Sequence, residues 1–132
     1  MNPTSRFLMY RLPVVLYAGL IFILSSGPVP STALENIPDY YLHFSEYGLF
    51  YIAMFWAIHE GFRPVQGRGS YWLPAILTIF FGISDEFHQL FVPSRDASIR
   101  DILADTVGAA AATVVALFYN RFHGPVSDRI EF

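Results

Sequence analysis

The sequence has 132 residues, of which 54% are hydrophobic, 17% aromatic and only 14% charged, with a net charge of −3 at pH 7. A water-soluble domain of this size exposes much of its surface and normally carries more charge. The absence of cysteine excludes disulfides, thiolate metal sites and a thiol nucleophile. The eight basic residues are all arginine and form no basic patch, so no nucleic-acid partner is indicated.

Four apolar segments each approach the length of about 20 residues that a helix needs to cross a bilayer. They cover about 9–27, 40–58, 71–91 and 99–119. Glycine and proline follow the second segment, Pro93 follows the third, and Gly124-Pro125 follows the fourth. We therefore predict an all-α membrane bundle of four transmembrane helices with short loops, forming a single domain over residues 1–132.

The first apolar segment has an alternative interpretation as a signal peptide. Arg6 and Arg11 make a basic start, 12–24 is an apolar core, and Ser31-Thr32-Ala33 is a poor cleavage site. Because the apolar stretch is long enough to span and the cleavage site is poor, a retained helix is favoured.

The arginines of the short loops predict the orientation of the helices. If all four segments span, Arg95 and Arg100 alone lie on one side of the membrane. The other six lie on the opposite side: Arg6, Arg11, Arg63, Arg68, Arg121 and Arg129. This asymmetry places both termini in the cytoplasm and the loops 25–39 and 92–98 outside.

Ionisable side chains gather at the predicted outer ends of three helices, although each costs about 2.5–3.5 kcal/mol at the centre of a bilayer. They are Asp39, His43 and Glu46 in the second helix, Asp85, Glu86 and His88 in the third, and Asp101 and Asp105 in the fourth. The side-chain amide of Gln89 follows them in the third helix. At a rise of 1.5 Å per residue, Glu46, Asp85 and Asp105 each lie roughly 8–10 Å below the outer end. The sequence thus predicts one polar layer near the outer face.

Helical spacing lets each set face a common centre. Residues 39, 43 and 46 share one stripe, and residues 101, 105 and 108 share another. Asp85, His88 and Gln89 share a face of the third helix, whereas Glu86 lies about 100° from Asp85 and is the weaker candidate. Gly108, followed by four alanines, predicts a close approach of a neighbouring backbone.

Structural explanations compete with a functional one for part of this layer. Asp39 complements a helix dipole if it only precedes the second helix. Asp101 fits a capping box with Ser98, and a lone histidine such as His43 is often a hydrogen-bonded packing residue. No capping role is available deep in a helix for the remaining carboxylates, and burying one without a partner is unfavourable. These are Asp85, Glu86 and Asp105.

The two arginines in and just after the outer loop at 92–98 have two interpretations. Arg95 and Arg100 either pair with Asp96 and Asp101, or they bind phosphate at the level of the lipid headgroups. The residue types support both interpretations equally.

Two segments resemble the VanZ-like membrane proteins, namely DYYLHFSEY at 39–47 and SDEFHQLFVPSRDASIRDILADTVG at 84–108. The residues that carry the resemblance are His43, Tyr47, Asp85, Glu86, Gln89, Pro93, Arg95, Asp101, Asp105 and Gly108. The resemblance implies a small multi-pass protein of the bacterial inner (plasma) membrane and cell envelope, the namesake being linked to low-level teicoplanin resistance. This sequence departs from the family where Lys often precedes the histidine, since Tyr40 and Tyr41 stand there, and where a polar residue often replaces Asp105.

The leading functional hypothesis is a protein that binds or modifies an envelope lipid or lipid-linked precursor. The candidate catalytic residues are His43, Glu46, Asp85, Glu86, His88 and Asp105. The candidate substrate-binding residues are Gln89, Arg95, Arg100 and Asp101. The catalytic version uses a carboxylate as general base and a histidine as proton shuttle.

Two other classes remain open, an ion- or proton-coupled transporter and a structural or assembly membrane protein. No cofactor is identified. A divalent cation on His43, Glu46, Asp85 and His88 matches no recognised spacing, so no metal site is predicted. The expected partner is a membrane lipid or lipid-linked precursor, and the oligomeric state, a homo-oligomer included, is left open.

Overall fold

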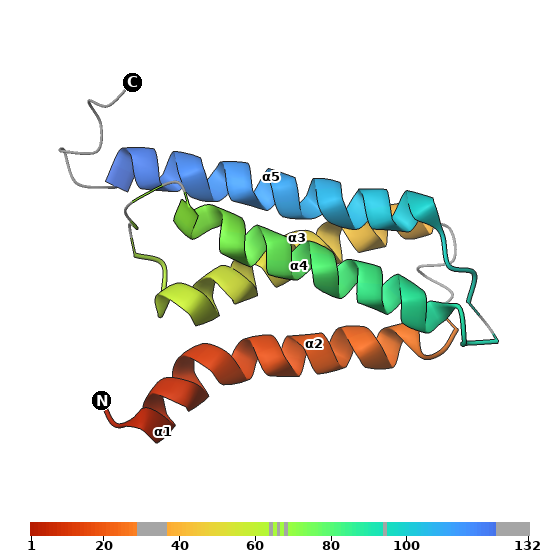
Figure 1. The fold of residues 1–132 in the computed structure, drawn as a ribbon, viewed down its shortest axis with the longest axis horizontal. Helices are drawn as coiled ribbons and strands as arrows, with labels where there is room; N and C mark the ends of the chain where they lie inside the picture. The colour runs from red at the N-terminus through yellow and green to blue at the C-terminus, as the bar shows by residue number, and fades with distance from the viewer. Residues whose placement is uncertain (29–36, 64, 66, 68, 94, 124–132) are drawn as a thin grey trace.

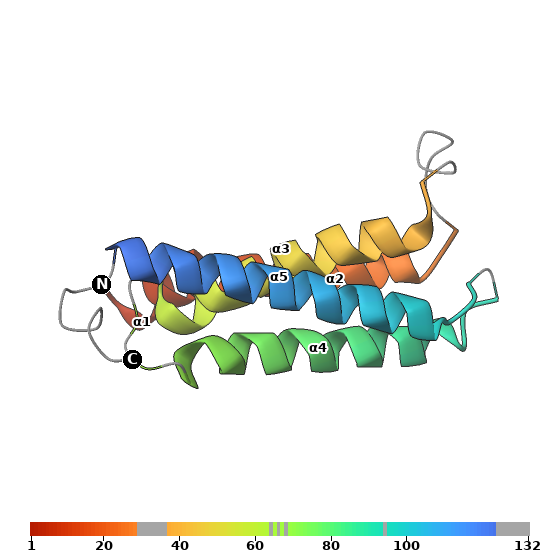
Figure 2. The ribbon, with the colours of Figure 1, turned by 90° about the horizontal axis from the view of Figure 1, so that it is seen from above.

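The computed structural model describes residues 1–28, 37–63, 65, 67, 69–93 and 95–123, and within these ranges it contains helices joined by short loops and no strand. The elements are α1 (Pro3–Arg6), η1 (Phe7–Arg11), α2 (Leu12–Ser25), α3 (Asp39–His59), α4 (Gly69–Gln89) and α5 (Ile99–His123). The first three elements are continuous, so four long helices lie side by side (Figures 1 and 2). The all-α prediction is confirmed. The candidate cleavage site at 31–33, the stop at 124–125 and the arginines at 68 and 129 lie outside the described residues.

The four helices alternate in direction, which brings specific ends together. The ends of α2 and α4 meet the beginnings of α3 and α5 at one end of the bundle (Figure 1). The beginning of α1 and the end of α5 lie at the other end. Ionisable residues near 39–46, 85–89 and 101–105 therefore share one end, as the sequence predicts.

Helix α3 packs most extensively against α5, and glycine makes this approach possible. A Cβ at Gly108 would collide with the carbonyl oxygen of Phe44 and lie 3.2 Å from the backbone nitrogen of Gly48. A Cβ at Gly48 would in turn lie 3.5 Å from the carbonyl oxygen of Gly108. The predicted close approach at Gly108 is confirmed, and it sets the distance across which α3 and α5 present their polar side chains.

A π-helical turn, η1, precedes a proline in the first helix. The Leu12 amide bonds to the Phe7 carbonyl across this wider turn. Pro13 has no N–H to donate to the carbonyl of Met9. The indole Nε1 of Trp56 in α3 donates to that carbonyl at 3.2 Å, so α3 satisfies a backbone group of the first helix.

A proline in α4 is compensated in the same way, by a side chain of α3. Pro74 lies inside this helix and removes the donor that would bond to the carbonyl of Ser70. Nε2 of His59 lies 2.8 Å from that carbonyl oxygen and donates to it. His59 therefore has a structural role at the end of α3 that is opposite the acidic residues.

Aromatic rings fill the interior between the helices, and apolar side chains also cover the outside. One buried cluster contains Tyr51, Phe55, Tyr71, Ala75 and Ala112, and a second contains Ile21, Tyr47 and Phe50. By length and composition, two helical segments are apolar enough to cross a membrane, Pro3–Ser25 and Ile99–His123. The expectation of four spans stays a prediction.

We predict that Gly108→Ala lowers the stability of the folded protein. The added methyl group must displace the backbone of α3, and overpacking of this kind costs about 1–3 kcal/mol. The measurement is the thermal unfolding midpoint of the purified chain in detergent. Gly19→Ala is the matched control because nothing lies within 4 Å of its added Cβ, so equal midpoints for the two variants would contradict the packing account.

Candidate functional site

The buried carboxylates and the buried imidazole of the described residues all lie at the end of the bundle where α3 and α5 begin. They are His43, Asp85, Glu86, Asp101 and Asp105. Asp105 is 1% exposed and Glu86 is 3% exposed, so neither carboxylate reaches bulk water. A charged group in such surroundings is stable only with hydrogen-bond donors or opposite charges close to it.

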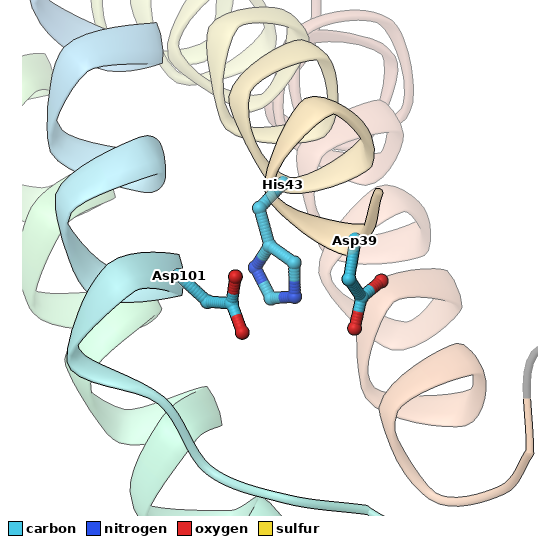
Figure 3. Close-up of side chains that lie close together, drawn as sticks. All are labelled: Asp39, His43 and Asp101. Atoms are coloured by element: carbon cyan, nitrogen blue, oxygen red, sulfur yellow. The ribbon is translucent and has the colours of Figure 1, made fainter. Parts of the chain in front are cut away.

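His43 lies between carboxylates from two helices. In Figure 3 its ring is flanked by Asp39, which begins α3, and by Asp101 from the first turn of α5. One ring nitrogen and one carboxylate oxygen from each aspartate lie within 4.8 Å of one another. Asp39 is partly exposed, whereas Asp101 is buried.

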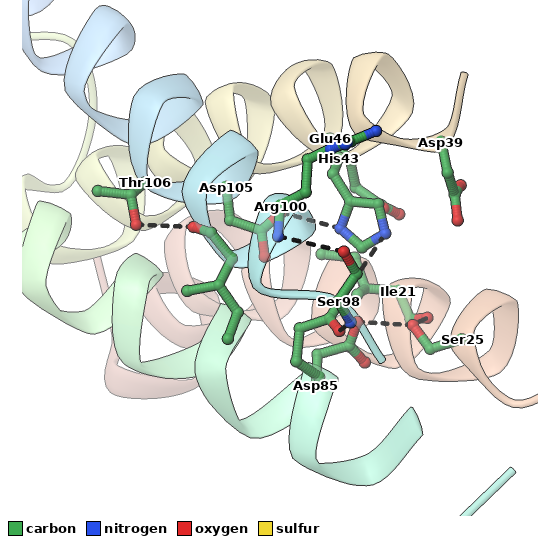
Figure 4. A network of polar contacts seen from close by, with 12 residues as sticks. Ile21, Ser25, Asp39, His43, Glu46, Asp85, Ser98, Arg100, Asp105 and Thr106 are labelled. Carbon is green, nitrogen blue, oxygen red and sulfur yellow. Dashed lines mark hydrogen bonds and ion pairs between the residues drawn. The ribbon is translucent and has the colours of Figure 1, made fainter. Parts of the chain in front are cut away.

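Asp105 fixes the orientation of the His43 ring. Its Oδ1 lies 2.9 Å from Nδ1 of His43 (Figure 4). Because an ionised carboxylate can only accept, Nδ1 carries the hydrogen of this bond. A neutral ring then has its lone pair on Nε2, and that atom faces Oε1 of Glu86 at 3.9 Å.

Glu86 connects α4 to the beginning of α5. Its Oε2 accepts a hydrogen bond from the backbone N–H of Ser98 at 2.8 Å, and Oγ of Ser98 accepts from the N–H of Arg100 at 3.1 Å. Ser98 is thus the N-cap of α5, but the carboxylate that bonds to its amide is Glu86. The expectation that Asp101 completes the capping box is corrected, and its carboxylate faces His43 instead.

Asp85 belongs to a neighbouring group that involves α2. Its Oδ2 accepts from Oγ of Ser25 at 2.7 Å (Figure 4). It also accepts from Nε2 of Gln89 at 3.2 Å. These two donors compensate the burial of the carboxylate. Helix α2 therefore contributes to the polar layer through Ser25, a residue that the sequence analysis did not select.

Arg95 closes the site on the side of the outer loop. One terminal nitrogen donates to the carbonyl of Leu24 at 2.8 Å, and the other lies 3.4 Å from the Asp39 carboxylate. Its Nε is buried and has no hydrogen-bond partner among the described residues. The sequence alternatives paired Arg95 with Asp96 or with phosphate, and the structure places it against Asp39.

A pocket of about 320 Å³ lies between α2 and α3 beside these groups. Its polar lining includes Asp39, His43, Glu46, Gln89 and Arg95, and its apolar lining includes Leu20, Leu24 and Leu42. Glu46 is partly buried in this wall. The pocket thus combines a charged region with an apolar one.

Two predicted site residues lie apart from His43. His88 stacks on Phe22 with ring centroids 4.4 Å apart, and its Nε2 lies 3.1 Å from Oγ of Ser26. Arg100 is exposed and borders a separate groove of about 570 Å³ on the outer face of α3 and α5. The structure does not bring these two residues into the buried group.

The helical position of Glu86 made it a weaker candidate than Asp85, and the sequence pattern did not indicate the hydrogen-bond donors to either carboxylate. A serine pair at 25–26, at the end of an apolar helix, was a signal for a buried donor. Gly82 gave no signal, although a Cβ there would lie 2.8 Å from Oδ2 of Asp105. The backbone groups of Ser98 and Leu24 carry no sequence signal because every residue has them.

We predict that His43 and Asp105 are energetically coupled. Asp105→Leu leaves Nδ1 of His43 buried without an acceptor, so the double variant with His43→Phe loses less than the two single losses together. The expected coupling is about 0.5–3 kcal/mol, measured by unfolding in detergent. Asp105→Leu combined with His59→Phe, at the opposite end of α3, is the control and is expected to be additive. Additivity in both pairs would contradict the assigned contact.

Comparison with known proteins gives one match. A family model described as VanZ/LLP1 matches residues 12–120, a range that includes every candidate site residue. A search of curated proteins and a search of solved structures found no match. The matched range covers most of the chain and contains both segments that carry the sequence resemblance. The chain therefore belongs to the VanZ/LLP1 family.

Proposed function

We propose that this VanZ-family chain is a four-span membrane protein whose outer polar site binds or modifies a lipid or lipid-linked component of the bacterial envelope. The observation that carries the proposal is the pocket between α2 and α3, which joins charged groups to a leucine wall. A lipid has the same division, with a polar headgroup and apolar chains. The whole described chain acts as one domain in this proposal.

The exposed surface of α4 supports its insertion in a membrane. Trp72, Phe80 and Phe87 are each more than half exposed, while Asp85 and Glu86 on the same helix are buried. In water this pattern would leave a large apolar surface hydrated, whereas in a bilayer lipid chains cover it. Helix α4 has 21 residues, as does α3, which is about the length needed to span.

Charge favours an orientation with the polar site outside. Of the described arginines, only Arg95 and Arg100 lie at the end with the polar site. Arginine at the cytoplasmic ends is the usual bias for inner-membrane proteins. The first helix is retained as a span in this proposal because Ser25 contributes to the polar layer.

We predict that an introduced thiol reports this topology, since the natural chain has no cysteine. A membrane-impermeant maleimide should label Asp96→Cys in intact cells and should label Arg63→Cys only after permeabilisation. Labelling of Arg63→Cys in intact cells would instead support two spans, α2 and α5. Labelling of Arg63→Cys alone would reverse the orientation.

The lipid phosphate is expected at Arg95. Its buried Nε has no partner in the described ranges, and the guanidinium lies beside a pocket that is also lined by Leu20 and Leu24. Arginine binds phosphate through paired N–H donors, and a phosphate here would compensate the positive charge as Asp39 does. Chains of the lipid would then lie along the leucines.

We predict that Arg95→Gln weakens binding of an anionic phospholipid such as phosphatidylglycerol several-fold. The measurement is native mass spectrometry of the full chain released from nanodiscs of phosphatidylglycerol and phosphatidylcholine. Arg63→Gln is the control because it removes an arginine at the other end of the bundle. Equal retention of phosphatidylglycerol by both variants would reject Arg95 as the phosphate ligand.

The modifying form of the proposal uses His43 for proton transfer. Asp105 holds its Nδ1–H, so Nε2 is available as a base toward a bound headgroup, an arrangement typical of general-base catalysis. A contribution to glycopeptide resistance is the finer part of the proposal and follows from the resemblance to VanZ. A proton-coupled transporter is less favoured because the buried carboxylates and the buried imidazole of the described residues occupy one end only.

A further inference from the structure

Two buried side chains, His43 and Glu86, present ligand atoms to each other without forming a hydrogen bond. Nε2 of His43 and Oε1 of Glu86 are 3.9 Å apart, beyond the usual range of about 2.7–3.2 Å. Oε1 of Glu86 is buried and accepts no hydrogen bond within the part of the chain that the structure describes. The lipid proposal leaves this carboxylate oxygen unexplained, because Glu86 does not line the pocket between α2 and α3.

Each of these two side chains is held by a second hydrogen bond behind the ligand atom. Oδ1 of Asp105 accepts from Nδ1 of His43, which leaves the Nε2 lone pair free. The backbone amide of Ser98 donates to Oε2 of Glu86, which leaves Oε1 free. Metal-binding histidines and carboxylates are typically oriented by outer partners of this kind.

A further carboxylate beside His43 comes from α5. Asp101 places a carboxylate oxygen within 4.8 Å of a His43 ring nitrogen and of an Asp39 oxygen. Asp101 is buried, whereas Asp39 lies at the exposed edge of the group (Figure 3). Ions could therefore reach His43 from the outer face past Asp39.

We propose that one divalent cation of the Zn²⁺ type binds between Nε2 of His43 and Oε1 of Glu86, with Asp101 and Asp39 as neighbouring carboxylates beside His43. One imidazole with carboxylates is a ligand set that Zn²⁺ accepts, and a site with fewer than four protein ligands leaves a coordination position open. Zinc bonds of about 2.0–2.2 Å require these two ligand atoms, 3.9 Å apart, to move closer by roughly 1 Å or less, a shift that side-chain torsions accommodate. The positive charge of the cation would compensate the negative charge of the carboxylates around His43.

The set differs from the one that the sequence suggested for a cation. That set comprised His43, Glu46, Asp85 and His88, and the structure separates its members. Asp85 is hydrogen-bonded to Ser25 and Gln89, and His88 stacks on Phe22. Only His43 is common to both, because the distances depend on how α4 and α5 pack against α3.

The test is Zn²⁺ binding to the full chain, purified in detergent with the affinity tag removed and stripped with a chelator. Calorimetric titration and elemental analysis are expected to give one bound equivalent. Glu86→Gln should lower the affinity at least tenfold. Its amide oxygen can still accept from Ser98, while its NH₂ group replaces the ligand oxygen, so the local hydrogen bond is retained. His43→Gln should have at least the same effect.

Asp96→Asn and His123→Gln are the matched controls, because they remove an exposed loop carboxylate and an exposed histidine at the far end of α5. Both are expected to bind Zn²⁺ as the natural chain does. A stripped natural chain that takes up no Zn²⁺ would overturn the proposal and leave a proton on Glu86 as the explanation. Wild-type affinity in folded Glu86→Gln and His43→Gln would also overturn it.

A further variant covers the case in which Glu86→Gln fails to fold. Asp101→Asn keeps the helix start capped by Ser98 and should still lower Zn²⁺ affinity, so unchanged affinity there counts against the site. The cation site does not depend on lipid binding, and a cation on Nε2 of His43 replaces the general-base role proposed for that atom, because both use the same lone pair. Arg95→Gln should lose phosphatidylglycerol and keep Zn²⁺, whereas Glu86→Gln should lose Zn²⁺ in detergent whether or not lipid is present.

Discussion

The burial of carboxylates at one end of a small helical bundle is the constraint on which the arrangement of this protein depends. Three of the buried acids accept a hydrogen bond from another element: Asp85 from Ser25 of α2, Asp105 from His43 of α3, and Glu86 from the amide of Ser98 before α5. These bonds cross between elements, so the polar layer also fixes how the four helices meet. The atoms that form the candidate site therefore also determine how the helices pack.

The opposite end of the bundle uses a different means to join its helices. Two prolines remove backbone donors, and side chains of α3 donate to the carbonyls concerned, Trp56 to Met9 and His59 to Ser70. Helix α3 thus contacts its neighbours through neutral donors at one end and through His43 at the other. This contrast supports placing the functional site at the acidic end, which has more polar groups than helix packing requires.

Three buried side-chain atoms close to this acidic end have no hydrogen bond within the described residues. They are Oε1 of Glu86, Oδ2 of Asp105 and Nε of Arg95, and the hydroxyl groups of Tyr47 and Thr78 are two further such atoms. A buried polar atom of this kind costs free energy unless a ligand, ion or proton compensates it. The proposed lipid phosphate at Arg95 and the proposed cation at Glu86 assign partners to two of the three, and they do so at separate positions.

The sequence by itself determined the helical class, the approximate positions of the four helices and the end of the bundle at which the ionisable residues lie, because these follow from the apolar runs and from the alternation of helix direction. It also indicated the close approach at Gly108 and the stripe that carries His43. Only the tertiary structure decided which acid pairs with which donor. In the structure Glu86 lies in the group with His43, and its carboxylate, in place of that of Asp101, accepts from the backbone amide of Ser98. His88 and Arg100 lie outside this group. The reason is physical: helical periodicity fixes the face on which a side chain lies, whereas hydrogen bonds between helices depend on their relative rotation and separation and on backbone groups that every residue shares.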